Sequence, residues 1–346
     1  MSYLNLDGPL RIVAIGGGTG LSTLLRGLKK FAYSKDGSPL VEITAIVTVT
    51  DDGGSSGRLR EEFSVLPPGD IRNCMVALSE DEALLSRLFQ YRFKGGKGLD
   101  GHSFGNLFLT ALTNLTGDFA QAVKFSGDVL AITGNIYPST ARNVSLEAEL
   151  ENGRMVSGET RISKSKIRIK RISLNPKNCK PLPETLDAIA KADLITMGPG
   201  SLFTSVIPNL LVKGIPEAIA KSRAVKAYFV NLMWQPGETT GFKASDHVEA
   251  IYAHSRPKLL DHVVVNTEKL PKAMLKRYEA EGSFAVETDV ERMEDMGIQV
   301  VGAPLVDRGK KIRHDSDNAA MIAVRLAERS RRLAAWKRSQ KGKEKA

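Results

Sequence analysis

Residues 11–28 read RIVAIGGGTGLSTLLRGL, and this stretch decides the fold. Its first part, RIVAI, is short, mostly apolar and rich in β-branched residues, which is typical of a strand buried in a parallel sheet. The turn GGGTG follows, and Leu21, Leu24, Leu25 and Leu28 then recur at helical spacing. The stretch therefore predicts a strand, a glycine turn and a helix.

The rest of the chain repeats this alternation. Further strands are predicted at 42–49, 129–133, 194–197, 224–232, 262–266 and 297–303. Helices are predicted at 72–79, 82–91, 106–115, 183–192 and 317–336. Alternating strands and helices indicate an α/β domain with a mainly parallel sheet and helices on both faces. We expect residues 1–335 to form one such domain.

A small β insertion interrupts this pattern at about residues 143–175. Apolar residues occupy every second position from 144 to 150, the period of a strand with one buried face. Asn152-Gly153 then predicts a type I′ hairpin turn.

The composition is that of a globular protein. The 346 residues are 42% hydrophobic and 25% charged, so disorder is excluded as the main state. The net charge is +10, of which residues 325–346 carry +7 and residues 142–180 carry +6, so the rest of the chain has a net charge of −3. This uneven distribution argues against a broad nucleic-acid surface. Residues 336–346 are Lys-rich and lack apolar periodicity, which predicts a basic, disordered tail.

Several classes of protein are disfavoured. The chain has two cysteines, Cys74 and Cys179, far apart in sequence, which excludes a disulfide framework and argues against a cysteine-based zinc site. No apolar run approaches the roughly 20 residues that span a bilayer. Residues 1–10 lack the basic flank and apolar core of a signal peptide. We therefore expect a cytoplasmic protein.

Four loops at predicted strand ends carry the candidate chemistry, because parallel strands bind ligands beyond their carboxyl ends. The first loop comprises Gly16, Gly17, Gly18, Thr19 and Gly20. Glycines let the backbone approach a diphosphate, and the following helix N-terminus favours an anion. Leu21 breaks the dinucleotide pattern G-x-G-x-x-G, and no Gly-Lys-Ser/Thr of a P-loop follows. A tight turn without a ligand is the alternative, and we favour phosphate binding.

The second loop contains Asp51, Asp52, Ser55, Ser56 and Arg58. Either Asp51 or Asp52 stands where a ribose or metal ligand is expected, and the serines offer hydroxyl donors. Arg58 could form paired hydrogen bonds with a phosphate or a carboxylate. A solvated, flexible loop is the weaker interpretation, because two carboxylates adjoin three glycines and two arginines.

The third loop is 66–73, in which Pro-Gly-Asp precedes a helical pattern. Asp70 is the predicted N-cap of that helix. It could also complete a divalent metal site with Asp51 or Asp52, and the two roles can coexist.

The fourth loop, 197–205, contains Gly198, Gly200 and Ser201. It lies between a predicted strand and a predicted helix, and a second glycine-rich anion loop suggests a ligand with two anionic or polar ends. Ser201 as a helix N-cap is compatible with binding. Asn231 and Arg313 are lesser candidates. No G-x-S-x-G elbow is present, and Cys74 lies in a predicted helix, so a hydrolase nucleophile has no support.

Taken together, these loops resemble those of the CofD-like superfamily, and within it the YvcK-type gluconeogenesis factors. The resemblance runs from about Arg11 to the final helix. It is carried by AIGGGTG (14–20), VTDDGGSSGR (49–58), PPGDIR (67–72), GPGSL (198–202), QPGET (235–239) and IRHD (312–315). The basic extension after Trp336 departs from the family pattern.

The resemblance implies an α/β, Rossmann-like doubly wound core and a UDP-sugar-binding regulator of cell shape and wall synthesis on gluconeogenic carbon sources. It places sugar-nucleotide contacts on the first glycine loop and on Arg313, with Arg58 or Arg313 neutralising the diphosphate. We also expect a homo-oligomer, a protein partner in cell-wall precursor supply, and no flavin or NAD as a bound prosthetic group. Contact of the basic tail with nucleic acid or membrane is the least favoured function.

The enzymatic relatives imply an alternative function. They transfer a phospholactyl-type group from a guanosine diphosphate adduct to a deazaflavin, with a divalent metal. By motif position, their metal-binding acids fall on Asp51 or Asp52 and on Asp70, and Mg²⁺ is the candidate ion. The alternative is therefore a metal-dependent transferase of the 2-phospho-L-lactate transferase type.

Overall fold

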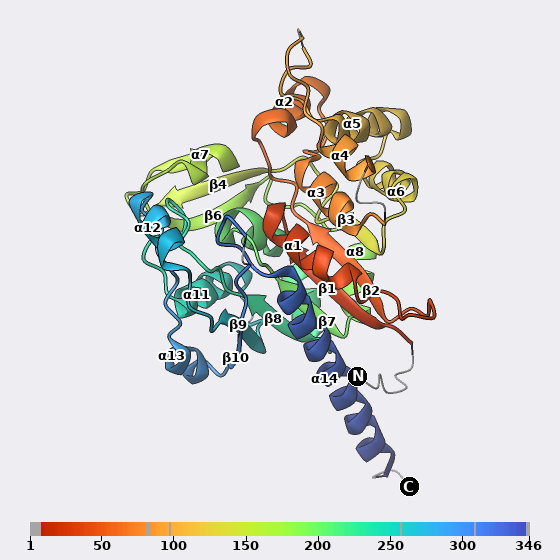
Figure 1. Cartoon of the computed structure of the whole chain (residues 1–346), viewed down its shortest axis with the longest axis vertical. Helices are drawn as coiled ribbons and strands as arrows, with labels where there is room; N and C mark the ends of the chain where they lie inside the picture. Colours follow the sequence, from red (N-terminus) through yellow and green to blue (C-terminus); the bar gives the residue numbers. More distant parts are fainter. Residues whose placement is uncertain (1–7, 81–83, 97, 257, 308, 344–346) are drawn as a thin grey trace.

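The structure is a computed structural model that describes residues 8–80, 84–96, 98–256, 258–307 and 309–343. Its centre is a seven-stranded sheet in the order β10-β9-β8-β7-β1-β2-β3, in which every neighbouring pair is parallel (Figure 1). The strands are β1 (Leu10–Gly16), β2 (Val41–Val47), β3 (Asn135–Pro138), β7 (Leu194–Met197), β8 (Val225–Phe229), β9 (His262–Asn266) and β10 (Gln299–Ala303). The predicted α/β class and parallel sheet are confirmed.

The strand order changes direction at β1. The chain moves from β1 outward to β2 and β3, then returns to pair β7 with the other edge of β1 and continues outward to β8, β9 and β10. Right-handed crossovers in opposite directions place the helices after β1 and after β7 on opposite faces of the sheet. In open parallel sheets, a change of direction in the strand order marks the crevice where ligands bind, beyond the carboxyl ends of the strands.

Helices lie on both faces of the sheet, and some of them pack mainly on other helices. They are α1 (Gly18–Lys29), α2 (Gly54–Phe63), α3 (Gly69–Leu78), α4 (Leu84–Gln90), α5 (Phe104–Thr116), α6 (Phe119–Val129), α8 (Pro183–Lys191), η1 (Leu202–Val206), α9 (Ile207–Leu210), α10 (Ile215–Lys221), α11 (Ala244–Ser255), α12 (Lys272–Ala280), α13 (Val290–Asp295) and α14 (Ser316–Lys343). Helix α1 buries the predicted leucine face and packs against α3 and α14. In the described part of the chain, only the η1–α9 and α10 pair, bent by 75°, has the length and apolar composition of a membrane span; no single helix has them.

The β insertion forms a separate three-stranded antiparallel sheet in the order β5-β4-β6. It comprises β4 (Ser145–Leu150), β5 (Met155–Ser157), α7 (Glu159–Ser163) and β6 (Ile169–Asn175). The expected alternation is present in β4, whose side chains are buried at every second position. The type I′ turn was a wrong prediction, because Gly153 is the only residue of the three-residue loop 151–153 with a positive φ, at +79°. That geometry is typical of a loop closed by a glycine bulge.

Two other predictions of secondary structure were wrong in part. Residues 129–133 do not form a strand: α6 continues to Val129, Ala131 has a positive φ of +45°, and the strand begins at Asn135. The side chain of Asp118 caps α6 by accepting a hydrogen bond from the Gln121 amide, and the helix absorbs part of the apolar run. The predicted helix at 82–91 is shorter, at Leu84–Gln90, and residues 81–83 lie outside the described residues.

The basic tail is helical rather than disordered as far as Lys343, because α14 continues to that residue. Residues 344–346 lie outside the described residues. The sequence 325–343 is rich in good helix formers, chiefly Arg, Lys, Ala and Leu. Arg331 ties the helix to the body, since its guanidinium pairs with Asp193 and donates hydrogen bonds of 2.6 Å to the carbonyls of Gly8 and Pro9.

Candidate functional site

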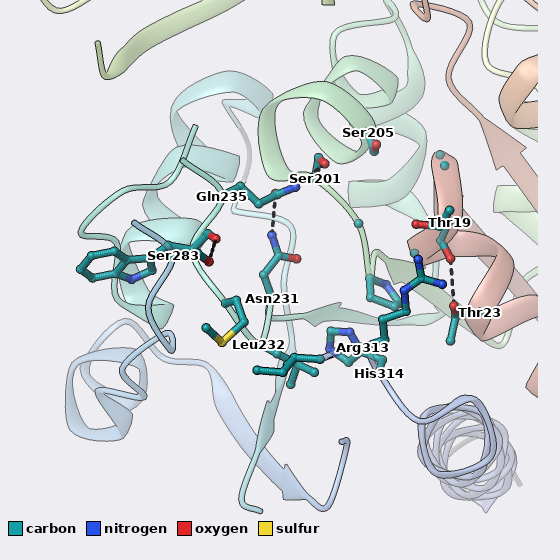
Figure 2. Close-up of a pocket in the computed structure, with 18 of the residues that line it drawn as sticks. Thr19, Thr23, Ser201, Ser205, Asn231, Leu232, Gln235, Ser283, Arg313 and His314 are labelled. Carbon is teal, nitrogen blue, oxygen red and sulfur yellow. Dashed lines mark hydrogen bonds between the residues drawn. The ribbon is translucent and has the colours of Figure 1, made fainter. Parts of the chain in front are cut away.

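A cavity of about 390 Å³ lies at the carboxyl ends of β1, β7 and β8 (Figure 2). Its wall comes from the two glycine loops, from the segment after β8, and from the segment before α14. The predicted site residues that line it are Gly17, Gly18, Thr19, Gly20, Asp70, Gly200, Ser201, Asn231 and Arg313. Residues separated by almost 300 positions in sequence thus meet at the switch point of the sheet, as open parallel sheets require.

The two glycine loops touch each other. A Cβ atom on Gly20 would collide with the carbonyl oxygen of Pro199 and lie 2.7 Å from the Cα of Gly200. A Cβ atom on Gly17 would lie 2.6 Å from Oδ2 of Asp70 and 2.7 Å from Cγ2 of Thr48. These two glycines are therefore required by close packing within the site, whether or not a ligand is present.

The N-terminus of α1 opens into the cavity. Its N-cap is Gly17, in an extended conformation and with no side chain of its own to cap the helix, and the Asp70 carboxyl accepts a hydrogen bond from the Gly18 amide. Helix N-termini leave their first amides without intrahelical partners, and the helix dipole adds partial positive charge there. Gly18, Thr19 and Gly20 line the cavity at this end. This part of the wall is suited to an anion.

Arg313 brings a full positive charge to the same cavity. In Figure 2 its guanidinium points toward the wall formed by Thr19. Within the described ranges its side chain has no hydrogen-bond or ion-pair partner. The neighbouring His314 holds the segment in place through a 3.0 Å hydrogen bond between its Nε2 and the Val230 carbonyl. Burial lowers the pKa of His314 to about 4, so its imidazole is neutral and donates this bond near neutral pH.

A row of amides and hydroxyls forms the opposite wall. Asn231 donates through Nδ2 to Oε1 of Gln235 at 3.0 Å, and Gln235 donates through Nε2 to Oγ of Ser201 at 2.6 Å (Figure 2). These bonds connect the loop after β8 to the loop after β7. The row offers both donors and acceptors, which suits the hydroxyl groups of a sugar.

Buried carboxylates form the remaining part of the site. Burial and the nearby charge of Asp51 raise the pKa of Asp70 to about 7, against the opposing effects of the Gly18 amide and Arg72. Burial also raises the pKa of Glu159 well above its ordinary value, and repulsion from Asp70 and Asp51 adds to this. Thr50 donates a hydrogen bond of 3.2 Å to Glu159. Carboxylates that repel one another favour a proton or a cation between them.

The structure separates the roles of the two adjacent aspartates. Asp52 accepts hydrogen bonds from the amide and hydroxyl of Thr160, at 2.8 Å and 2.7 Å, and so anchors α7 to the core. Asp51 accepts a bond of 2.9 Å from the Gly53 amide, and its charge acts on Asp70. Asp51 is thus the one that faces Asp70. Among the described residues, no group of three or more His, Cys, Asp or Glu is arranged to hold a metal ion.

Seven predicted residues do not line the cavity: Gly16, Asp51, Asp52, Ser55, Ser56, Arg58 and Gly198. Ser55 pairs with Nδ1 of His102 at 3.0 Å. Arg58 is directed away and donates to the carbonyl of Asp100 at 2.7 Å. The structure therefore favours Arg313 over Arg58 as the cation of this cavity.

Sequence reasoning did not find several lining residues. Glu159 reaches the cavity from the β insertion, and no motif marks it in the sequence. Trp234, Tyr278 and Ser283 line the cavity from loops and from the end of α12. Of these residues, only Trp234 has a sequence signal, because it directly precedes the QPGET stretch.

Comparisons with known proteins identify the family of the chain. The family described as 2-phospho-L-lactate transferase CofD matches residues 12–306. A protein of Bacillus subtilis named gluconeogenesis factor is 49% identical over 91% of this chain and 98% of its own length. A protein of Halalkalibacterium halodurans with the same name is 47% identical over 92% of this chain and 95% of its length. A crystal structure of a Bacillus halodurans protein has a TM-score of 0.87 and 47% identity, covering 91% of this chain and 99% of that one. The chain therefore belongs to the CofD family, in its gluconeogenesis-factor branch.

Proposed function

We propose that this chain binds a nucleotide-diphospho-sugar, with a UDP-sugar as the first candidate, in the cavity between β1 and β7. The observation that carries the proposal is the meeting of the N-terminus of α1, where Gly18, Thr19 and Gly20 line the cavity, with Arg313, which has no partner among the described residues. A helix N-terminus and a guanidinium on one cavity form a complementary pair for a diphosphate. The cavity of about 390 Å³ is within the range of small-molecule sites.

In this proposal the chain is a cytoplasmic regulator rather than an enzyme. The name gluconeogenesis factor, which the relatives carry, supports a role connected with gluconeogenesis. The proposal extends this role to cell shape and wall synthesis during growth on gluconeogenic carbon sources. The ligand-bound form, as a homo-oligomer, reports to a protein partner in cell-wall precursor supply. The amide row from Asn231 to Ser201 would bind the sugar hydroxyls.

Calorimetry with UDP-N-acetylglucosamine tests this proposal. We expect saturable binding, weakened roughly tenfold to a hundredfold by Arg313→Ala, because a charge-assisted hydrogen bond contributes about 1.5 to 3 kcal/mol. Arg58→Ala is the matched control, since Arg58 has the same charge but does not line the cavity. Equal affinities in wild type and Arg313→Ala would remove Arg313 from the site, and an effect of Arg58→Ala alone would place the diphosphate elsewhere.

The buried carboxylates support a second candidate, a metal-dependent transferase. Mg²⁺ is commonly held by one or two carboxylates together with substrate phosphates and water, so Asp51 and Asp70 fit such an ion beside a bound diphosphate. A bound Mg²⁺ would supply charge neutralisation for phosphoryl transfer. The chain's own contribution would be to position the diphosphate on α1 and Arg313.

Incubation with nucleotide diphosphate adducts and candidate acceptors, with and without Mg²⁺, separates the two functions. Metal-dependent turnover that Asp70→Asn abolishes would establish the transferase. Tight binding without turnover would favour the regulator.

A further inference from the structure

Helix α14 has an outward face that the fold does not use. Its N-terminal part packs on α1, β1, β7 and β8, and Arg331 is bonded to Asp193 and the N-terminal segment. Beyond this anchor the helix projects away from the sheet (Figure 1). At 3.6 residues per turn, the buried Leu326, Ala327 and Ser330 point toward the body.

An adjoining, solvent-exposed face is basic and also carries two apolar side chains. A shallow groove of about 360 Å³ is lined by Arg325, Glu328, Arg329, Arg332, Leu333 and Trp336. At about 100° per residue, all of these except Glu328 fall within roughly a third of the helix circumference. Leu333 is 46% exposed and Trp336 is 59% exposed. We call these five residues (Arg325, Arg329, Arg332, Leu333 and Trp336) the outer face of α14.

The cations of this outer face are free. Arg325, Arg329 and Arg332 form no ion pair or hydrogen bond with any residue that the structure describes. The sequence from 325 to 346 adds further basic residues and carries a net charge of +7. Most of this charge lies on the projecting helix, and the three arginines of its outer face are not neutralised by any described residue.

Membrane contact is the least favoured function for a disordered basic tail, but the segment is helical as far as Lys343 and groups its arginines with Leu333 and Trp336. We therefore propose that the outer face of α14 docks this protein on an anionic lipid surface. Arginines with aliphatic stems and a Trp ring together match the headgroup region, where the guanidinium meets lipid phosphate and the indole lies at the interface. Negatively charged leaflets attract such clusters electrostatically. The helix would lie along the membrane with its buried side still packed on the protein.

The apolar residues favour lipid over other partners. Binding to a nucleic-acid backbone needs the arginines but gains little from an exposed leucine. A second copy of the chain would present the same cluster of arginines, and like charges would repel. An anionic membrane satisfies both the cations and the apolar pair.

Co-sedimentation of the full chain with vesicles tests the proposal. We expect binding to vesicles of equal phosphatidylcholine and phosphatidylglycerol, little binding to phosphatidylcholine alone, and weakening by salt. Arg329→Gln/Arg332→Gln should lower the partition coefficient roughly thirtyfold, from the usual contribution of each surface basic residue. Trp336→Ser should also weaken binding while leaving net charge unchanged. Arg154→Gln/Lys177→Gln, two exposed residues of the basic insertion region, make the matched charge control.

Circular dichroism of each variant verifies that α14 is intact. Loss of binding in both outer-face variants, with the control unchanged, supports the proposal. An equal loss of vesicle binding in the control variant would show that only the total charge matters, and this would overturn the proposal. Binding to duplex DNA or RNA without vesicle binding, or a concentration-dependent dimer that Trp336→Ser disrupts, would assign the face to another partner. None of these readouts depends on nucleotide binding.

Discussion

Asp70→Asn should make the ligand-free protein more stable at alkaline pH. The Asp70 carboxyl is buried beside Asp51, and its pKa in the folded protein is about 7 against an ordinary value of 3.8. The folded state thus holds a proton that the unfolded chain has already lost. Below about pH 3.8 the carboxyl is protonated in both the folded and the unfolded state, and it does not lower the free energy of unfolding. As the pH rises from about 3.8 to about 7, the free energy of unfolding falls, because the unfolded chain releases the proton first.

The size of this loss follows from the pKa difference. A shift of slightly more than three units, at about 1.4 kcal/mol per unit, corresponds to about 4 kcal/mol above pH 7. Asn keeps the size of the side chain, and its carbonyl oxygen still accepts the bond from the Gly18 amide, but it has no charge to bury. Of the total, roughly 2 to 3 kcal/mol should be lost between about pH 5 and about pH 8.

Urea unfolding at these two pH values, with EDTA present, measures the effect. The wild-type free energy of unfolding should fall relative to that of Asp70→Asn as the pH rises. In separate calorimetry without EDTA, the variant should lose any Mg²⁺-dependent part of ligand binding. Asp187→Asn removes an exposed carboxylate on α8 and controls for net charge. Parallel profiles for wild type and Asp70→Asn, or a less stable Asn variant at the higher pH, would refute the reasoning.

Two further predictions concern the walls of the same cavity. Gly20→Ala should destabilise the protein by about 1 to 3 kcal/mol and weaken UDP-sugar binding, because the new methyl group collides with the backbone of Pro199. Urea unfolding measures the first effect and calorimetry the second. Unchanged stability and affinity would contradict the packing argument. His314→Gln should remove a loss of stability on acidification: the pKa of the buried imidazole is about 4 instead of 6.5, so stability falls by up to about 3 kcal/mol as the pH drops through this interval. Thermal unfolding of both proteins across that interval checks it, and an unchanged slope in the variant would exclude His314 as the source.

The strands and the glycine loops could be predicted because their physical causes are local. A strand buried on both faces needs an unbroken apolar run. The ranges predicted from such runs for β7 and β9 therefore coincide with the observed strands. The first helix was found from its leucine spacing. The helical tail was missed because the pattern of 336–346 lacks an apolar face, whereas the helix continues on the propensity of its residues from a part anchored at Arg331.

The sequence alone established an α/β chain with glycine and acid loops at strand ends, since local periodicity and turn chemistry encode these features. Only the tertiary structure decided which loops meet. The order of the strands puts β1 beside β7, and this brings Gly20 against Pro199 and Arg313 to the same cavity while leaving Arg58 outside it. It also places Glu159, from a distant insertion, beside Asp70. Strand order depends on long-range packing, and no short stretch of sequence records that packing.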